Sequence, residues 1–265
     1  MNVYFGSHNS QAIIVSNILK TYFPTIAYLR IFTRSPTHYR ISIFKAKANI
    51  FPPEEIESYE GIALYFHPDF IRKYPLGKTI NQYGFFSYDV SEALFLSAKE
   101  KEIIANLFAT IAAELQNNID NFSQDVLVSQ IELLLNYSNR FYNRQFITRK
   151  AVNHDIITSL DELLNSYFEG ETGLKNGSPS VKYISTELKL SPRYLSDMLG
   201  SLTGLNTQRY IQNAIVEKAK EKLSTTNLSV SEIAYDLGFE HSQSFSKFFK
   251  TKTNASPLEF RQSFD

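Results

Sequence analysis

The sequence predicts an α+β protein: a β-rich amino-terminal part with a helical hairpin, followed by an all-α part that contains two similar helix-turn-helix units. Three observations lead to this fold class. Short aromatic and β-branched runs, broken by prolines, fill the chain from Tyr28 to Phe86. A helical periodicity of apolar residues replaces them from Ser97 onward. An internal repeat with an offset of 49 to 50 residues then occupies the carboxy-terminal part.

Composition and charge exclude several classes of protein. The chain has 265 residues and a mass of 30.4 kDa, which suits two ordinary domains or one large one. Basic and acidic side chains are balanced at 27 each, so an anionic partner must be met by a local patch. The absence of cysteine excludes disulfides, thiolate zinc sites and a cysteine nucleophile. The sequence shows neither a basic leader nor a long apolar run, so we expect a cytoplasmic protein without a membrane partner.

Residues 1–96 are predicted to be β-rich. The runs Tyr39–Phe44 and Gly61–Phe66 combine aromatic and β-branched residues, as short strands do, and the prolines and glycines between such runs favour turns. The aromatic residues of these runs either line a ligand pocket or form plain core; they are Tyr39, Phe44, Tyr65 and Phe66. The sequence leaves the residues that would bind an effector unknown.

Residues 97–150 are predicted to form a helical hairpin. Apolar residues recur at helical steps in two stripes, which are Ile104, Phe108, Ile111 and Leu115, then Leu127, Ile131, Leu134 and Phe141. The stripes can be buried against their own domain or against a second copy of the chain, because both arrangements need the same seam. The sequence leaves these two alternatives open.

The domain boundary is predicted near Lys150–Asn153. We therefore expect a sensor or dimerisation domain over 1–150 and an all-α domain over 151–265. The first helix of the second domain is predicted to run from Ile156 to Phe168, with Asp155 as its N-cap. Residues 1–174 hold 15 basic and 18 acidic side chains, whereas residues 175–265 hold 12 and 9. The carboxy-terminal part is thus the better anion binder.

The repeat is the most informative feature of residues 151–265. In each copy, the apolar residues of a short helix precede a tight polar turn, and those of a second helix follow it. The first copy places Ile184, Leu188, Leu190, Leu195 and Leu199 at these positions, and the second places Ile233, Leu237, Phe239, Phe245 and Phe249. Two crossing helices would share such a set of side chains as a small core.

Local signals mark the helix ends of both copies. Ser191 is a predicted N-cap and is followed by a proline at the first helical position. Ser229 has a glutamate three residues later, which is the pattern of a capping box. Gly238 is placed where a helix ends in a left-handed residue, whereas the first copy has Lys189 there. The turn of the first copy is therefore less clearly specified.

One long helix is predicted to join the two copies. Its apolar face consists of Tyr210, Ile211, Ala214, Ile215, Ala219 and Leu223. From Asn206 to Leu223 this helix would span about 27 Å at 1.5 Å per residue. Successive major-groove faces of B-DNA recur every ~34 Å, so a rod of this length could hold two reading helices near that spacing.

The carboxy-terminal part of the sequence resembles the AraC/XylS family of bacterial transcription regulators. The resemblance rests on Leu190–Leu199, Ile233–Gly238, Phe239–Lys250 and Ser256–Arg261, and it covers about residues 152–265. It implies a seven-helix DNA-binding domain with two helix-turn-helix units. It also implies that residues 1–150 are a shortened form of the cupin-like β-barrel and helical hairpin with which relatives sense a small molecule or dimerise.

Helix geometry and this resemblance together predict the side chains that meet DNA. The exposed residues of the first reading helix are Arg193, Ser196 and Asp197. Arg193 suits guanine, and Asp197 either accepts from cytosine or is only a charge near a helix N-terminus.

The second reading helix is predicted to expose Ser242, Gln243, Ser246 and Lys247. Gln243 suits adenine, and Lys247 suits guanine or phosphate. We expect Lys250, Lys252 and Arg261 to contact phosphates. Ile215 stands where many members of the family have an arginine, so we expect modest DNA affinity that needs a dimer or a bent operator.

Two other functions compete with DNA binding. An enzyme is not expected, because the five histidines at 8, 38, 67, 154 and 241 lack metal-ligand spacing and neither a nucleophile elbow nor a phosphate-binding glycine loop is present. We therefore predict neither catalytic nor metal-binding residues and no cofactor. A sensor or interaction module whose DNA-binding domain is weak or inactive is the second alternative, favoured by the low net charge and by Asp197.

The sequence as a whole predicts a transcription regulator that binds double-stranded promoter DNA. We expect a homodimer through residues 97–145 and an amino-terminal module that binds a small effector or serves as a dimer scaffold. Effector binding would then shift the population between two arrangements of the domains. A contact with RNA polymerase stays open.

Overall fold

The computed structural model describes residues 2–4, 13–16, 27–35, 38–45, 61–170 and 177–264. Contacts within the chain divide it into two compact units, Met1–Thr148 and Arg149–Asp265, which are called unit 1 and unit 2 below. Each unit is described separately.

Unit 1 contains one antiparallel sheet with the strand order β1-β2-β5-β4-β3-β6. Its strands are β1 (Asn2–Tyr4), β2 (Ile13–Ser16), β3 (Ala27–Ser35), β4 (His38–Lys45), β5 (Gly61–Phe66) and β6 (Leu94–Phe95). The central pair, β4 and β5, places Ile41 opposite Leu64, which is fully buried. The strands predicted at Tyr39–Phe44 and Gly61–Phe66 are confirmed, and Phe66 is buried core. The cupin-like barrel stays a prediction.

After Phe66 the sequence prediction of strands and turns was wrong. Short helices follow instead: α1 (Pro68–Ile71), α2 (Pro75–Thr79), η1 (Ile80–Gln82), η2 (Gly84–Ser87) and η3 (Val90–Glu92). Pro68 and Pro75 each occupy the first helical position, where a missing amide N–H costs nothing and the fixed φ suits a helix. The sequence pattern predicts Pro68 and Pro75 to be strand breakers, and in the structure they start helices. The His67 side chain accepts a hydrogen bond from the Asp69 amide at 3.1 Å and caps the first of these helices.

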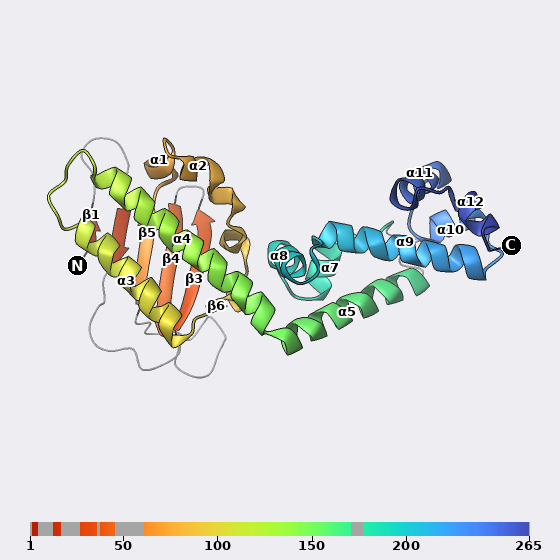
Figure 1. Cartoon of the computed structure of the whole chain (residues 1–265), viewed down its shortest axis with the longest axis horizontal. Helices are drawn as coiled ribbons and strands as arrows, with labels where there is room; N and C mark the ends of the chain where they lie inside the picture. Colours follow the sequence, from red (N-terminus) through yellow and green to blue (C-terminus); the bar gives the residue numbers. More distant parts are fainter. Residues whose placement is uncertain are drawn as a thin grey trace. The chain divides into compact units, whose positions relative to one another are not determined.

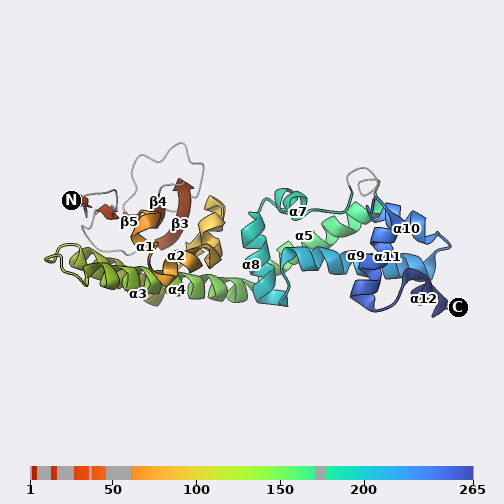
Figure 2. The ribbon, with the colours of Figure 1, turned by 90° about the horizontal axis from the view of Figure 1, so that it is seen from above.

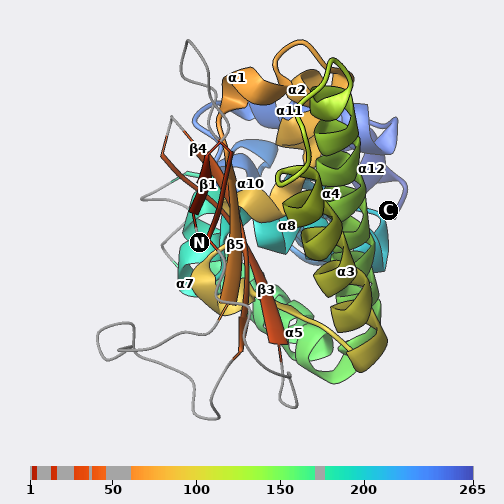
Figure 3. The same ribbon diagram turned by 90° about the vertical axis from the view of Figure 1, so that its left-hand side faces the viewer.

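The predicted helical hairpin is present as α3 (Ala98–Glu114) and α4 (Ser123–Thr148), which cover one face of the sheet (Figures 1 and 3). Ser97 and Glu100 form a capping box at the start of α3. Both predicted stripes are buried within unit 1, with exposures of 6% or less. The stripes are therefore buried against their own domain and not against a second copy of the chain. A dimer would need another face of these helices.

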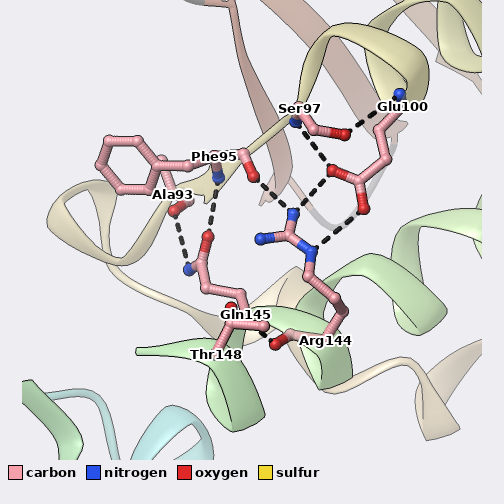
Figure 4. Close-up of polar contacts among 7 residues, drawn as sticks. All are labelled: Ala93, Phe95, Ser97, Glu100, Arg144, Gln145 and Thr148. Atoms are coloured by element: carbon pink, nitrogen blue, oxygen red, sulfur yellow. Dashed lines mark hydrogen bonds and ion pairs between the residues drawn. The ribbon is translucent and has the colours of Figure 1, made fainter. Parts of the chain in front are cut away.

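A polar clamp joins α4 to the edge strand β6 (Figure 4). The Gln145 side chain accepts from the Phe95 amide at 2.8 Å and donates to the Ala93 carbonyl at 3.3 Å, so its amide pairs with β6 as a neighbouring strand would. Arg144 binds Glu100 at 3.0 and 2.7 Å and the Phe95 carbonyl at 2.7 Å. These bonds satisfy an otherwise open sheet edge.

The described residues of unit 2 form helices joined by short loops and turns. Its helices are α5 (Lys150–Glu169), α7 (Val181–Glu187), α8 (Pro192–Thr203), α9 (Thr207–Thr225), α10 (Val230–Asp236), α11 (Ser242–Thr253) and α12 (Pro257–Gln262). The first of these begins six residues before the predicted Ile156, so Asp155 lies inside the helix and the prediction that it is an N-cap was wrong. No glycine or proline interrupts Lys150–Asp155, so nothing stops the helix from starting earlier.

Two structural features do not occur among the described residues. None of their helices combines the length and apolar character that crossing a membrane requires. Within the same residues, no three histidine, aspartate or glutamate side chains are grouped as a metal site would need.

Candidate nucleic-acid interface

The two helix-turn-helix units, α7–α8 and α10–α11, make the same turn from different sequences. The turn residues Lys189 and Gly238 both have left-handed backbones, with φ of 55° and 81°. The amide after each turn residue donates to the carbonyl five residues earlier at 2.9 Å, which is the bond that closes a Schellman motif. The turn that the sequence left uncertain therefore forms with a lysine.

Gly238 is required for a second reason, which the sequence did not predict. A Cβ atom at this position would overlap the backbone of Gly177 and Ser178. The Ser178 hydroxyl donates to the Leu237 carbonyl at 3.1 Å, and the Tyr167 hydroxyl donates to the Gly177 carbonyl at 2.8 Å. The segment before α7 is thus packed on the turn of the second unit, in a contact between residues about sixty apart that no local pattern encodes.

The first reading helix, α8, is built as predicted. The Ser191 hydroxyl accepts from the Tyr194 amide at 3.2 Å, and Pro192 is the first helical residue. Leu195, Met198 and Leu199 are fully buried. Burying side chains of this size stabilises the unit by roughly 1.5–3 kcal/mol each.

The predicted DNA-contacting residues of α8 are not independent. Arg193 is exposed, and Ser196 and Asp197 are half-buried. The Arg193 Nε donates to the Asp197 carboxylate at 3.0 Å, one helical turn away. The polar face of this helix therefore carries one positive and one negative charge that are paired with each other.

The second reading helix, α11, carries a different set of charges. Phe245 and Phe249 are fully buried, and Phe248 packs against Phe239 with ring centroids 5.4 Å apart. Gln243, Lys247, Lys250 and Lys252 are exposed, while Ser242 and Ser246 are half-buried. The helix contains three lysines and no acidic residue. The Lys252 ammonium donates to the Gln212 side chain on α9 at 2.7 Å, so it is partly engaged within the unit.

Arg261 is hydrogen-bonded within unit 2. Its guanidinium donates to the carbonyls of Leu223 at 3.2 Å and Leu228 at 2.6 Å, at the end of α9 and in the loop that follows. Carbonyls beyond a helix end need such partners. Arg261 therefore fixes α12 on α9, and its phosphate contact stays a prediction.

The connecting helix α9 holds the two helix-turn-helix units at its ends. Helices α7 and α8 lie at one end, and α10, α11 and α12 lie at the other (Figures 1 and 2). Its 19 residues span about 28 Å. Its buried face consists of Ile211, Ile215, Val216, Ala219 and Leu223. The predicted helix is present, but Tyr210 and Ala214 of its predicted apolar face are half-buried and Val216 is buried in addition. Ile215 lies inside the core of unit 2.

Helix α5 runs parallel to α9 and braces it. The Tyr210 hydroxyl donates to Asp161 at 2.8 Å, and the Lys218 ammonium lies 3.7 Å from Glu169, eight residues further along both helices. Burial and the neighbouring Asp161 carboxylate raise the pKa of Tyr210 to about 12. The hydroxyl therefore stays a donor at all physiological pH values.

Comparison with known proteins finds relatives for the carboxy-terminal part of the chain. Residues 184–263 match the family described as "Helix-turn-helix domain". The chain is 31% identical over 144 residues to the HTH-type transcriptional activator RhaS of Salmonella newport, covering 54% of this chain and 47% of RhaS. It is 30% identical over 124 residues to a histidine kinase of Formosa agariphila, covering 46% of this chain and 9% of the kinase.

A solved structure is similar over the same part. The carboxy-terminal domain of the two-component response regulator yesN from Fusobacterium nucleatum is 34% identical, with a TM-score of 0.32, and the match covers 38% of this chain and 95% of that domain. The chain spans about half the length of the RhaS proteins it matches and less than a tenth of the kinase. Residues 184–263 therefore form an AraC-type helix-turn-helix domain.

Proposed function

We propose that this protein is a sequence-specific regulator of transcription that binds double-stranded DNA through both helix-turn-helix units. The observation that carries the proposal is the pair of units with the same turn geometry, held at the two ends of one helix. A helix of about 28 Å with flanking turns suits two major-groove segments about 34 Å apart. The name of the RhaS relatives, transcriptional activators, supports the same function.

The side chains divide between sequence reading and phosphate binding. Arg193, Ser196 and Asp197 on α8, with Ser242, Gln243, Ser246 and Lys247 on α11, are the candidates for base contacts. Lys250 and Lys252 follow on the same helix and are candidates for phosphate contacts. Lys247, Lys250 and Lys252 are all exposed and charged, and the Lys252 ammonium also donates to the Gln212 side chain.

A mobility-shift assay at low and moderate salt tests this proposal. The probe is a duplex enriched from a random library by the wild-type protein, and the variants are Gln243→Ala and Lys247→Ala. Both should weaken binding by roughly 5- to 100-fold if they remove base contacts. The matched control is Lys220→Ala on α9, which removes one lysine that is already paired with Glu217. A wild-type protein that forms no salt-sensitive complex would overturn the proposal.

A sensor or interaction module with inactive helix-turn-helix units is the second candidate. The specific observation in its favour is the Arg193–Asp197 pair, which neutralises one of the two reading helices. The same assay separates the two functions, because this module would not enrich any duplex from the library.

We further propose that the protein dimerises through an outward row formed by α4 and Phe122, the residue before it. Residues of this row are spaced by alternating steps of four and three and all are exposed; they are Phe122, Val126, Ser129, Leu133, Asn136, Arg140, Asn143 and Ile147. The apolar members are strongly exposed for their type: 70% for Phe122, 46% for Leu133 and 54% for Ile147. Half of the row is apolar and half is polar, and exposed apolar residues at this spacing suit a seam between two helices.

An antiparallel pairing of two such rows suits the charges best. It places Phe122 opposite Ile147 of the second copy and Arg140 opposite Ser129, whereas a parallel pairing would place Arg140 opposite itself. Sedimentation of the full chain at tens of micromolar should give a dimer, and Leu133→Lys should give a monomer. Val152→Lys, at an equally exposed apolar residue of unit 2, is the control and should remain a dimer. A monomeric wild type would exclude this interface.

The remaining parts of the proposal concern regulation. Unit 1 is proposed to be a shortened cupin-like domain that binds a small effector or acts as a dimer scaffold, in a cytoplasmic protein. Effector binding would change promoter occupancy only if the effector prefers one arrangement of the units over another. RNA polymerase is a further candidate partner. Thermal unfolding of the full chain with a small-molecule library tests effector binding, since a ligand that binds the native state raises the midpoint.

A further inference from the structure

We infer that Asp197 is a specificity-determining residue. Because it pairs with Arg193, the first helix-turn-helix unit contributes base discrimination. The second helix-turn-helix unit supplies the positive charge that attracts any DNA. This inference rests on the proposed DNA binding and deepens it. It follows from comparing the two reading helices position by position.

The two reading helices correspond with an offset of 50 residues, from Pro192 and Ser242 at their starts to the left-handed residues Gly204 and Asn254 at their ends. Asp197 corresponds to Lys247, and Gly200 corresponds to Lys250. Among charged residues the first helix has only Arg193 and Asp197, and the second has three lysines. The formal charges of the two helices are therefore zero and +3.

The Arg193–Asp197 pair is poorly placed as a source of stability. Arginine near a helix N-terminus, with its acidic partner four residues later, is the orientation that the helix dipole disfavours. The side chains are 46% and 30% exposed, and exposed pairs contribute little to folding. The pair lies on the face that carries the candidate base contacts, so its effect is expected in binding.

The pair sets what the first unit gains from a given DNA sequence. An unpaired arginine would bind the phosphates of any sequence and would raise non-specific affinity. With Asp197 beside it, approach to a phosphate also brings a carboxylate near that phosphate, which opposes the gain. A site that offers guanine to Arg193 and the amino group of cytosine to Asp197 satisfies both side chains. Only such a site compensates for opening the pair.

The experiment compares affinity for two duplexes of about 30 base pairs, enough for two major-groove segments. One duplex is enriched from a random library by the wild-type protein, and the other has the same base composition in scrambled order. Fluorescence anisotropy is measured for the full chain between about 50 and 200 mM salt. The variant is Asp197→Asn, which keeps the shape and removes the charge. The control is Glu217→Gln, which breaks an ion pair of 2.8 Å on α9.

We expect Asp197→Asn to bind the scrambled duplex about 3- to 10-fold more tightly, with a salt slope steeper by about 0.9, the value for one more phosphate contact. Affinity for the enriched duplex should rise less or fall, so the ratio of the two affinities should drop at least about threefold. Glu217→Gln should leave that ratio unchanged.

The outcomes separate this inference from the proposed function. If the wild type binds both duplexes in a salt-sensitive way and Asp197→Asn keeps the wild-type ratio, the inference is overturned while DNA binding stands. If the wild type binds neither duplex, both fail. Circular dichroism verifies that the variant is folded. If Asp197→Asn is not folded, Asp197→Ser replaces it, and a drop in its ratio supports the inference while an unchanged ratio overturns it.

Discussion

The first helix-turn-helix unit makes its turn with Lys189 and starts its reading helix with a serine cap and a proline, whereas the second makes the same turn with Gly238 and starts its reading helix without a side-chain cap. Both turns close the same backbone hydrogen bonds. The comparison teaches that the backbone hydrogen bonds of the turn and the small apolar core fix the backbone, because both helix-turn-helix units share them. The residue at the turn changes how much strain the backbone stores, and in the second helix-turn-helix unit it must also leave room for the backbone of Gly177 and Ser178.

The surfaces of the two units differ more than their backbones. The first reading helix presents an internally paired arginine and aspartate, and the second presents lysines without an acidic neighbour in the helix. One backbone therefore supports two different electrostatic roles. The expected outcomes below test this comparison.

The largest effect is expected for Gly238→Ala. The substitution adds a Cβ that overlaps the backbone of Gly177 and Ser178 and also places a side chain at positive φ. We expect a loss of about 3 kcal/mol or more in the free energy of unfolding, measured by urea titration. Gly204→Ala is the control, because it has a φ of 74° but open space around its Cβ. It should cost only about 1 kcal/mol, and equal losses would show that the packed segment is irrelevant.

Arg261→Ala should give the next largest loss, about 2 kcal/mol, because two carbonyls lose a charged donor. The slope of DNA affinity against salt should stay unchanged, since the side chain serves the fold. Should the slope instead fall by about 0.9, Arg261 contacts a phosphate and its structural role is secondary.

Helix caps should give effects of about 1 kcal/mol that distinguish the two units. Ser191→Ala removes the side-chain acceptor of the Tyr194 amide and should cost about 1 kcal/mol. His241, the N-cap of α11, makes no side-chain cap bond, so His241→Ser should stabilise unit 2 by about 0.5 kcal/mol. Thermal melts of both variants provide the measurement, and a destabilising His241→Ser would show that the imidazole has a structural partner.

An effect as small as that of His241→Ser is expected for Lys189→Gly. Glycine relieves the left-handed strain of a side-chain-bearing residue but adds backbone freedom to the unfolded chain. The two contributions nearly cancel, and we expect a gain of about 0.5 kcal/mol by urea titration. A loss larger than about 0.5 kcal/mol would mean that the lysine side chain itself stabilises the first turn.

Local patterns predicted much of unit 2. The caps at Ser191 and Ser229, the left-handed Gly238 and the buried residues of both repeats depend on residues within about one helical turn, so the sequence reveals them. The Arg193–Asp197 pair was not predicted, but the sequence contains the signal for it, because residues four apart share a helix face.

Other features depend on partners that are distant in the sequence. The contact of Gly238 with Gly177, and the bonds of Arg261 to Leu223 and Leu228, join residues more than thirty positions apart. In unit 1, prolines signal either a break or a helix start, and only packing decides between them. The predicted DNA contacts themselves stay a prediction.

Hydroxyl-radical footprinting of one chain on an enriched duplex tests the central claim most directly, because it records where both units lie on the same molecule. The account predicts two protected segments on one face of the duplex, about 10 base pairs apart, with Lys247→Ala weakening one of them and Arg193→Ala the other. A single protected segment, or two segments on opposite faces of the duplex, would contradict it.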